Sequence, residues 1–194
     1  MNIVYLHGFQ SGPLSIKGQQ LQQYCQQLHP DITVHLPDLN LPPLQVMQRI
    51  DEYFRTLENV VLVGSSLGGF YATCAALKYR CPTVLINPVV QPWRLFQERF
   101  SDIQLPYQVH ENWRLDQQHL TELEQLHQPA VQDLDKFLVL LQQGDEVLDY
   151  REAERYYRQG KHCGLVITET SGSHAMTNFV EKIPMLLTFL SHSL

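Results

Sequence analysis

The 194-residue sequence has little of what would assign it to several common classes of protein. Cysteine is rare, and Cys25, Cys74, Cys81 and Cys163 show no CxxC spacing, which argues against a zinc site or a disulfide framework. We expect all four to be reduced, buried thiols. No apolar run reaches the roughly 18 residues that a membrane-spanning helix needs.

Positive charge and cofactor motifs are also scarce. Lysine and arginine number 14 against 20 aspartates and glutamates, so the formal net charge of -6 gives no reason to expect nucleic acid as a partner. The N-terminal segment MNIVYLHGF has no basic leader and leads straight into a strand pattern, which predicts a cytoplasmic protein without a signal peptide. HExxH, a P-loop and a GxGxxG after a strand are all missing. We therefore expect neither a metal nor a cofactor.

What the sequence does contain is an alternation of short aliphatic runs and longer helical patterns. The runs predict buried strands at IVYL (3–6), TVHL (33–36), VVLVG (60–64), TVLIN (83–87), FLVLL (137–141) and LVITE (165–169). Helices are predicted at 14–28, 43–58, 67–80, 149–157 and 175–191, with Pro184 expected to divide the last into two. This order predicts an α/β fold with a mostly parallel, doubly wound sheet of about six strands.

One region, residues 89–135, interrupts the alternation. No strand is predicted in it, and Leu120, Leu123 and Leu126 indicate one helix. An insertion of this length between strands is often functional, so we favour a cap or lid over ordinary packing helices. The chain is predicted to be a single domain, 1–194, with this cap insertion.

The stretch GSSLG (64–68) fits the pattern G-x-S-x-G, in which a sharp strand-to-helix turn exposes a serine nucleophile. Only Ser66 can be the central residue, because centring on Ser65 would need glycines where the chain has Val63 and Leu67. The preceding VVLV and the following helix are the context that the pattern requires. We predict Ser66 as the nucleophile, with a structural turn serine as the alternative.

A serine needs a base and an acid, which follow it in the order Asp or Glu, then His. Of nine histidines only His174 directly follows the last predicted strand, so it is the expected base. The acid is expected after the strand at 137–141, where Asp145 comes just past Gly144. Asp149 is the alternative, although it can instead cap the next helix, with Glu152 completing a capping box.

The prediction for the site also covers one neighbouring carboxylate and two backbone N–H groups. Glu146, next to Asp145, is expected to point elsewhere. The oxyanion hole is predicted to use the backbone N–H groups of Leu67, which follows the nucleophile, and of Phe9, which follows His-Gly at the end of the first strand. Gly8 would allow the close backbone approach, although His-Gly could be a simple turn.

The segments YLHGF, PDL, GSSLGGFYAT, INP, GDEVLDY and SGSHAMTNF, in this order, resemble the YqiA-type bacterial esterases of the α/β-hydrolase superfamily. The resemblance covers nearly the whole chain. It implies a compact hydrolase fold and a cytoplasmic esterase of acyl esters or acyl-CoA thioesters, with Ser66, Asp145 and His174 at the matching triad positions.

These observations predict a serine esterase that forms an acyl-enzyme on Ser66 and acts on a small acyl ester or thioester. The same triad could instead support C–C bond hydrolysis, acyl transfer or perhydrolysis, and a non-catalytic binding protein is the third hypothesis. Aromatic side chains of the insertion could form an acyl pocket or belong to the core; they are Trp93, Phe96, Phe100 and Trp113.

Overall fold

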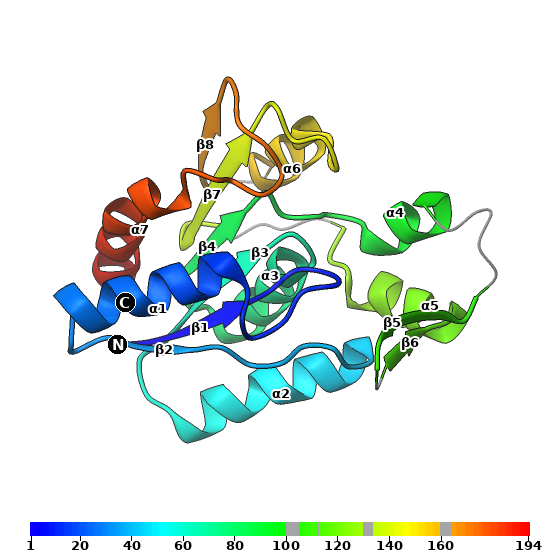
Figure 1. Cartoon of the computed structure of the whole chain (residues 1–194), viewed down its shortest axis with the longest axis horizontal. Coiled ribbons are helices and arrows are strands. Elements are labelled where there is room, and N and C mark those ends of the chain that lie inside the picture. Colours follow the sequence, from blue (N-terminus) through cyan, green and yellow to red (C-terminus); the bar gives the residue numbers. More distant parts are fainter. Residues whose placement is uncertain (100–104, 112, 130–133, 160–163) are drawn as a thin grey trace.

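A six-stranded parallel sheet forms the centre of the molecule (Figure 1). The computed structural model describes residues 1–99, 105–111, 113–129, 134–159 and 164–194. The strands run in the order β2-β1-β3-β4-β7-β8, and every neighbouring pair is parallel. Their bounds are β1 Asn2–Leu6, β2 Thr33–His35, β3 Val60–Ser65, β4 Thr83–Ile86, β7 Phe137–Gln142 and β8 Leu165–Glu169. The predicted fold class and all six predicted strands are confirmed.

Helices cover both faces of this sheet, and the side chains of each strand alternate between them. In β1, Ile3 and Tyr5 pack against α1 (Ile16–Leu28) and α7 (Phe179–Ser193), in a cluster that includes Leu21 and Ile183. Val4 and Leu6 belong to the opposite cluster, with α2 (Pro43–Thr56), α3 (Leu67–Tyr79) and α6 (Tyr150–Tyr157). Because both faces are buried there, the inner strands β1, β3, β4 and β7 read as nearly continuous apolar runs.

The expected break at Pro184 is wrong, since α7 runs through it without interruption. Pro184 itself is exposed, while Phe179, Ile183, Leu186, Leu187 and Leu190 are buried against the sheet. Packing of this apolar face offsets the backbone hydrogen bond that proline cannot make.

The insertion contains a hairpin that was not predicted. Helix α4 (Pro92–Arg99) is followed by the antiparallel strands β5 (Tyr107–His110) and β6 (Trp113–Leu115) and then by α5 (Gln117–Leu126), which is the predicted helix. These four elements gather at one end of the molecule, beyond the edge of the central sheet (Figure 1). The strands are short and expose alternate residues, so they lack the apolar run that marks the strands of the central sheet.

The cysteine side chains that the structure describes are free. Cys25 and Cys81 are buried and Cys74 is half-buried, and burial raises the pKa of the Cys74 thiol to about 12. Cys163 lies outside the described residues. Within the described part of the chain, no helix has both the length and the apolar character to cross a membrane.

Candidate active site

Ser66 sits on a sharp turn between β3 and α3 with a backbone conformation that is rare for a side-chain-bearing residue, φ 55° and ψ -119°. The neighbouring glycines make the turn possible. A Cβ on Gly68 would lie 2.0 Å from the carbonyl oxygen of Leu6, and one on Gly64 would lie 2.4 Å from the carbonyl oxygen of Gly68. A strained serine backbone between two closely packed glycines is the strand-to-helix turn that the G-x-S-x-G pattern predicts.

His174 reaches this serine from the loop after β8. Its Nε2 lies 3.0 Å from Ser66 Oγ, and its Nδ1 lies 2.7 Å from Asp145 Oδ2. A carboxylate only accepts hydrogen bonds, so Nδ1 carries the proton and donates it to Asp145. Nε2 is then left with a lone pair that accepts the serine hydroxyl. The structure thus brings Ser66, His174 and Asp145 together in one hydrogen-bonded line.

Asp145 is fixed in place at the end of β7. Its side chain is 2% exposed, and its Oδ1 accepts the backbone N–H groups of Val147 and Leu148, both at 2.8 Å. These bonds leave Oδ2 directed at His174 Nδ1. Hydrogen bonds to an ionised carboxylate are strong and directional, so the turn aims the acid at the imidazole.

The two neighbouring carboxylates have other partners. Asp149 caps α6 by accepting the Arg151 N–H at 3.0 Å, as predicted, but the structure has no reciprocal bond from Glu152, so the expected capping box is wrong. Glu146 was expected to point away. Instead its Oε2 accepts the backbone N–H of His174 at 3.0 Å, and this bond lowers the pKa of the carboxyl.

Asn87 is a second support of the histidine loop that sequence reasoning missed. This buried residue follows β4, and its Nδ2 donates to the carbonyl oxygens of Ser173 (3.1 Å) and His174 (3.2 Å). Its Oδ1 accepts the Gln142 N–H at 3.0 Å, which ties the loop to the end of β7. The signal in the sequence was a polar residue directly after a buried strand, at the sheet edge where ligands bind.

The predicted oxyanion positions flank the serine. Leu67 is the first residue of α3, so its N–H has no carbonyl partner within the helix. On the other side, a Cβ on Gly8 would lie 3.2 Å from Ser66 Cβ, so the chain just before Phe9 passes close to the serine. The Phe9 ring packs against Phe96 of the insertion, with ring centroids 4.6 Å apart.

His7 fastens the loop that carries Phe9. Its Nε2 accepts the N–H of Leu39 at 3.0 Å, so the proton is on Nδ1, which donates to the Gly8 carbonyl at 2.9 Å. The ring is buried, and burial lowers its pKa. His7 is therefore a neutral structural group beneath the site.

A cleft of about 480 Å³ opens beside Ser66 and His174. Its other walls come from the β1–α1 loop and the start of α1, including Leu14, Ile16 and Lys17, and from the residues 175–177 that follow His174. The aromatic residues proposed for an acyl pocket are not among its lining residues. Trp93, Phe96 and Trp113 are buried in the core cluster, and Phe100 lies outside the described residues.

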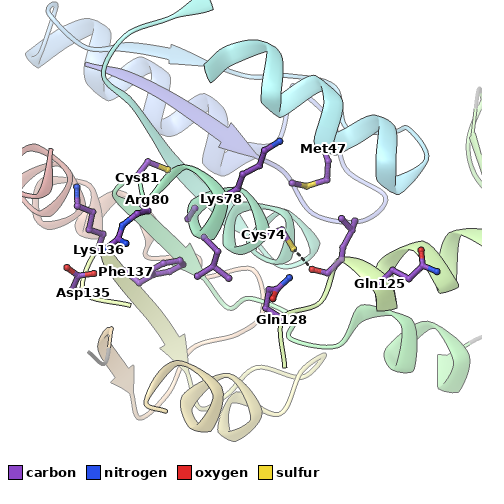
Figure 2. Close-up of a pocket in the computed structure, with 13 residues that line it drawn as sticks. Met47, Cys74, Lys78, Arg80, Cys81, Gln125, Gln128, Asp135, Lys136 and Phe137 are labelled. Atoms are coloured by element: carbon purple, nitrogen blue, oxygen red, sulfur yellow. Dashed lines mark hydrogen bonds between the residues drawn. The ribbon is translucent and has the colours of Figure 1, made fainter. Parts of the chain in front are cut away.

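A larger cavity, of about 640 Å³, lies at the opposite end of α3 (Figure 2). Lys78 and Arg80 line it, as does Cys74, whose Sγ is 3.5 Å from the Leu126 carbonyl oxygen. Because Ser66 precedes the first turn of α3 and the α3 residues that line this cavity begin at Cys74, about 12 Å or more of helix separates the two sites. The larger cavity is therefore remote from Ser66 and His174. We assign the candidate active site to the smaller cleft, which both residues line.

Comparison with known proteins identifies the family. The model of the uncharacterised protein family UPF0227 matches residues 2–191. The chain belongs to this family. It is the family of the YqiA-type proteins, so the resemblance in the sequence is confirmed.

Several solved structures of low sequence identity share the architecture of this UPF0227 protein. Est1E from Butyrivibrio proteoclasticus matches with a TM-score of 0.72 and 14% identity, over 99% of this chain and 87% of that one. Alpha/beta hydrolase domain-containing protein 10 from mouse matches with 0.70 and 15%, over 98% and 90%. A pyrethroid hydrolase from Sphingobium faniae JZ-2 matches with 0.62 and 13%, over 98% and 97%. The chain therefore has the α/β-hydrolase fold.

Proposed function

We propose that this protein is a serine hydrolase that cleaves carboxylic esters or thioesters through an acyl-enzyme on Ser66. The observation that carries the proposal is the line of two hydrogen bonds from Ser66 Oγ through the His174 ring to Asp145, at 3.0 and 2.7 Å. The strained turn at Ser66 supports it, because strain of this kind persists where function requires it.

Each member of the line has a defined task in this reaction. His174 Nε2 takes the proton from Ser66 Oγ as the oxygen attacks the carbonyl carbon, and then gives that proton to the leaving group. Asp145 keeps the imidazole in the required tautomer and stabilises the imidazolium that forms. Water, activated in the same way, releases the acid from Ser66. No step requires a cofactor.

The negative charge on the tetrahedral intermediate is stabilised by the backbone N–H groups of Leu67 and Phe9. Leu67 has a free helical N–H position, and the start of α3 adds the positive end of the helix dipole. Phe9 is supplied by the loop that Gly8 brings against Ser66. Donors held this way require little reorganisation during the reaction.

We also assign residues 89–135 to a cap within the single domain. Its Phe96 and Trp113 contact Phe9, with ring centroids 4.6 and 6.2 Å from that ring, so the cap touches the loop beside the nucleophile. The similar structures include proteins named as hydrolases, and one is the complex of Est1E with ferulic acid. Their names support a hydrolase.

The test is labelling with a fluorophosphonate, which reacts with an activated serine. We expect the wild-type protein to be labelled at one residue, Ser66→Ala to lose the label, and Ser65→Ala to keep it. Turnover of 4-nitrophenyl butyrate should fall on the order of 10⁶-fold in Ser66→Ala, as expected for loss of a triad serine. Folded wild-type protein that takes up no label would contradict the proposal and favour a binding protein.

Substrate panels separate the remaining reactions of the same triad. Rates on 4-nitrophenyl esters and on CoA thioesters of increasing acyl length define the acyl preference. Addition of an alcohol or hydrogen peroxide as competing acceptor reports acyl transfer or perhydrolysis, and a vinylogous 1,5-diketone reports C–C bond hydrolysis. We expect hydrolysis of the simple esters to dominate.

A further inference from the structure

Lys17 is a charged side chain in the active-site cleft to which the proposed mechanism gives no role. It lies in the first turns of α1, and it lines the same cleft as Ser66 and His174. Its Nζ donates one hydrogen bond, to the carbonyl oxygen of Ala175 at 2.7 Å. An ammonium group has three donors, so this bond leaves two for another partner.

Within the described part of the chain, no ion pair balances the charge of Lys17. The cleft lining holds no aspartate, glutamate or arginine, and no carboxylate of the described residues lies within 4.0 Å of Lys17 Nζ. Asp145 acts on it only at longer range, and that carboxylate is already bonded to His174. The lysine is half-buried, and the loss of solvent lowers its pKa. A partly desolvated ammonium without a counterion is costly unless a ligand supplies one.

Apolar side chains lie beside Lys17 in the cleft. Leu14 and Ile16 precede Lys17 along the chain and line the same cleft, yet they are 78% and 73% exposed. Large apolar side chains left open at the wall of a cleft are typical of a surface that a ligand covers. The cleft therefore offers an apolar wall, one cation and the serine.

We propose that Lys17 determines specificity by binding an anionic group, such as a carboxylate, carried by the ester substrate elsewhere than at the cleaved bond. The apolar part of the substrate lies over Leu14 and Ile16, and the anion pairs with the ammonium. This inference rests on the proposed function, since it concerns the substrate of the same site.

A purely structural role for Lys17 makes a different prediction. Its bond to Ala175 also ties α1 to the loop of His174. If that were its whole contribution, substitution would lower the turnover of charged and neutral esters by the same factor. Anion recognition instead changes the ratio between them, mainly through KM.

The experiment compares kcat/KM for matched esters that differ by one charge. On the acyl side, the mono-4-nitrophenyl ester of glutaric acid is compared with 4-nitrophenyl pentanoate. On the alcohol side, 4-carboxyphenyl butyrate is compared with its methyl ester. We expect wild type to prefer the anionic member of at least one pair. The preference should fall about 10- to 100-fold in Lys17→Gln, which keeps a donor for Ala175 but loses the charge, and should survive in Lys17→Arg.

Lys78→Gln is the matched control. It removes the same charge from α3, where Lys78 pairs with Asp51 outside the cleft, so it should leave the preference of wild type unchanged. Equal rates on both members of both pairs in wild type would overturn the role of Lys17, and so would a preference that Lys17→Gln retains. The proposed function would survive either result, because the neutral esters and fluorophosphonate labelling test it separately.

Discussion

Among single residues, Gly68 determines whether the chain can place Ser66 where it lies. Its α-carbon packs so closely on the end of β1 that a Cβ would lie 2.0 Å from the Leu6 carbonyl oxygen and 2.6 Å from that of His7. Both obstacles are backbone, so the methyl group could fit only if α3 moved away from the sheet. We expect Gly68→Ala to lower the free energy of unfolding by several kcal/mol, about 3 or more, and to abolish ester turnover. Urea denaturation and turnover of 4-nitrophenyl butyrate measure the two effects.

Gly12→Ala provides the control for that experiment. The nearest atom to a Cβ at Gly12 is Asn40 Nδ2, at 3.9 Å, which is ordinary contact. Its stability should stay within about 0.5 kcal/mol of wild type. A Gly68→Ala protein as stable as Gly12→Ala would show that the turn tolerates a side chain and that its glycine is not required.

Asp145 and Asp149 differ by four positions in sequence and entirely in contacts. Asp145 is buried and bonded to His174 Nδ1, whereas Asp149 caps α6 in solvent. Asp145→Asn should therefore lower kcat about 10⁴-fold, because an amide can donate to the imidazole and favour the wrong tautomer. Asp149→Asn should keep most of the activity and the stability, since asparagine is an equally good cap. Loss of turnover in the second variant alone, with the fold intact, would exchange the two assignments.

At the scale of elements, helix α7 shows how far side-chain packing outweighs the low helix propensity of a proline. Pro184 removes one backbone N–H donor from the exposed side of α7, while the buried side stays apolar. Pro184→Ala restores a backbone N–H without changing a core contact, so we expect the protein to become more stable, by up to about 3 kcal/mol. Thermal denaturation measures this as a higher Tm. A lower Tm would mean that the helix depends on the fixed backbone angle of the proline.

Strands β1, β3, β4 and β7 could be predicted from the sequence because they are almost fully buried and read as nearly unbroken apolar runs. The β5–β6 hairpin could not, because Tyr107–His110 exposes every second residue and Trp113–Leu115 is only three residues long. Residues at the ends of parallel strands meet at one edge, which is why Ser66, Asp145 and His174 could be named as a set. Their roles stay predictions until the variants are measured.

The supporting contacts of the site could not be predicted in this way. Asn87, Glu146 and Lys17 each bond to the backbone of the 173–175 loop from a different element. Such bonds depend on which segments far apart in sequence come into contact, and the spacing of residues along the chain does not predict those contacts. Their residue types are also common on surfaces, so nothing in the sequence alone distinguishes them from solvated side chains.

For the molecule as a whole, one buried and two partly buried histidines make the fold sensitive to mild acid. Burial lowers the pKa of His7, His35 and His127 below the ordinary value of about 6.5. Below that pH the unfolded chain takes up protons that the folded protein resists, so stability is full above about pH 6.5 and is lost as the pH falls through the folded pKa values. The Lys182 side chain lowers the pKa of Glu169 in the folded state, which adds a second loss of stability in stronger acid, below about pH 4.5.

His7 allows the first of these two losses to be traced to one residue. Its Nε2 accepts the Leu39 N–H, and a protonated ring would have to give up that bond and turn a donor toward another donor. We expect the free energy of unfolding of wild type, measured by urea denaturation, to fall between pH 7.5 and pH 5.5. His7→Gln cannot take up a proton, so it should start less stable at pH 7.5 but lose less over the same interval. His35 and His127 remain in that variant, which is why part of the decline should persist. Parallel stability curves for the two proteins would mean that protonation of His7 does not contribute to acid unfolding.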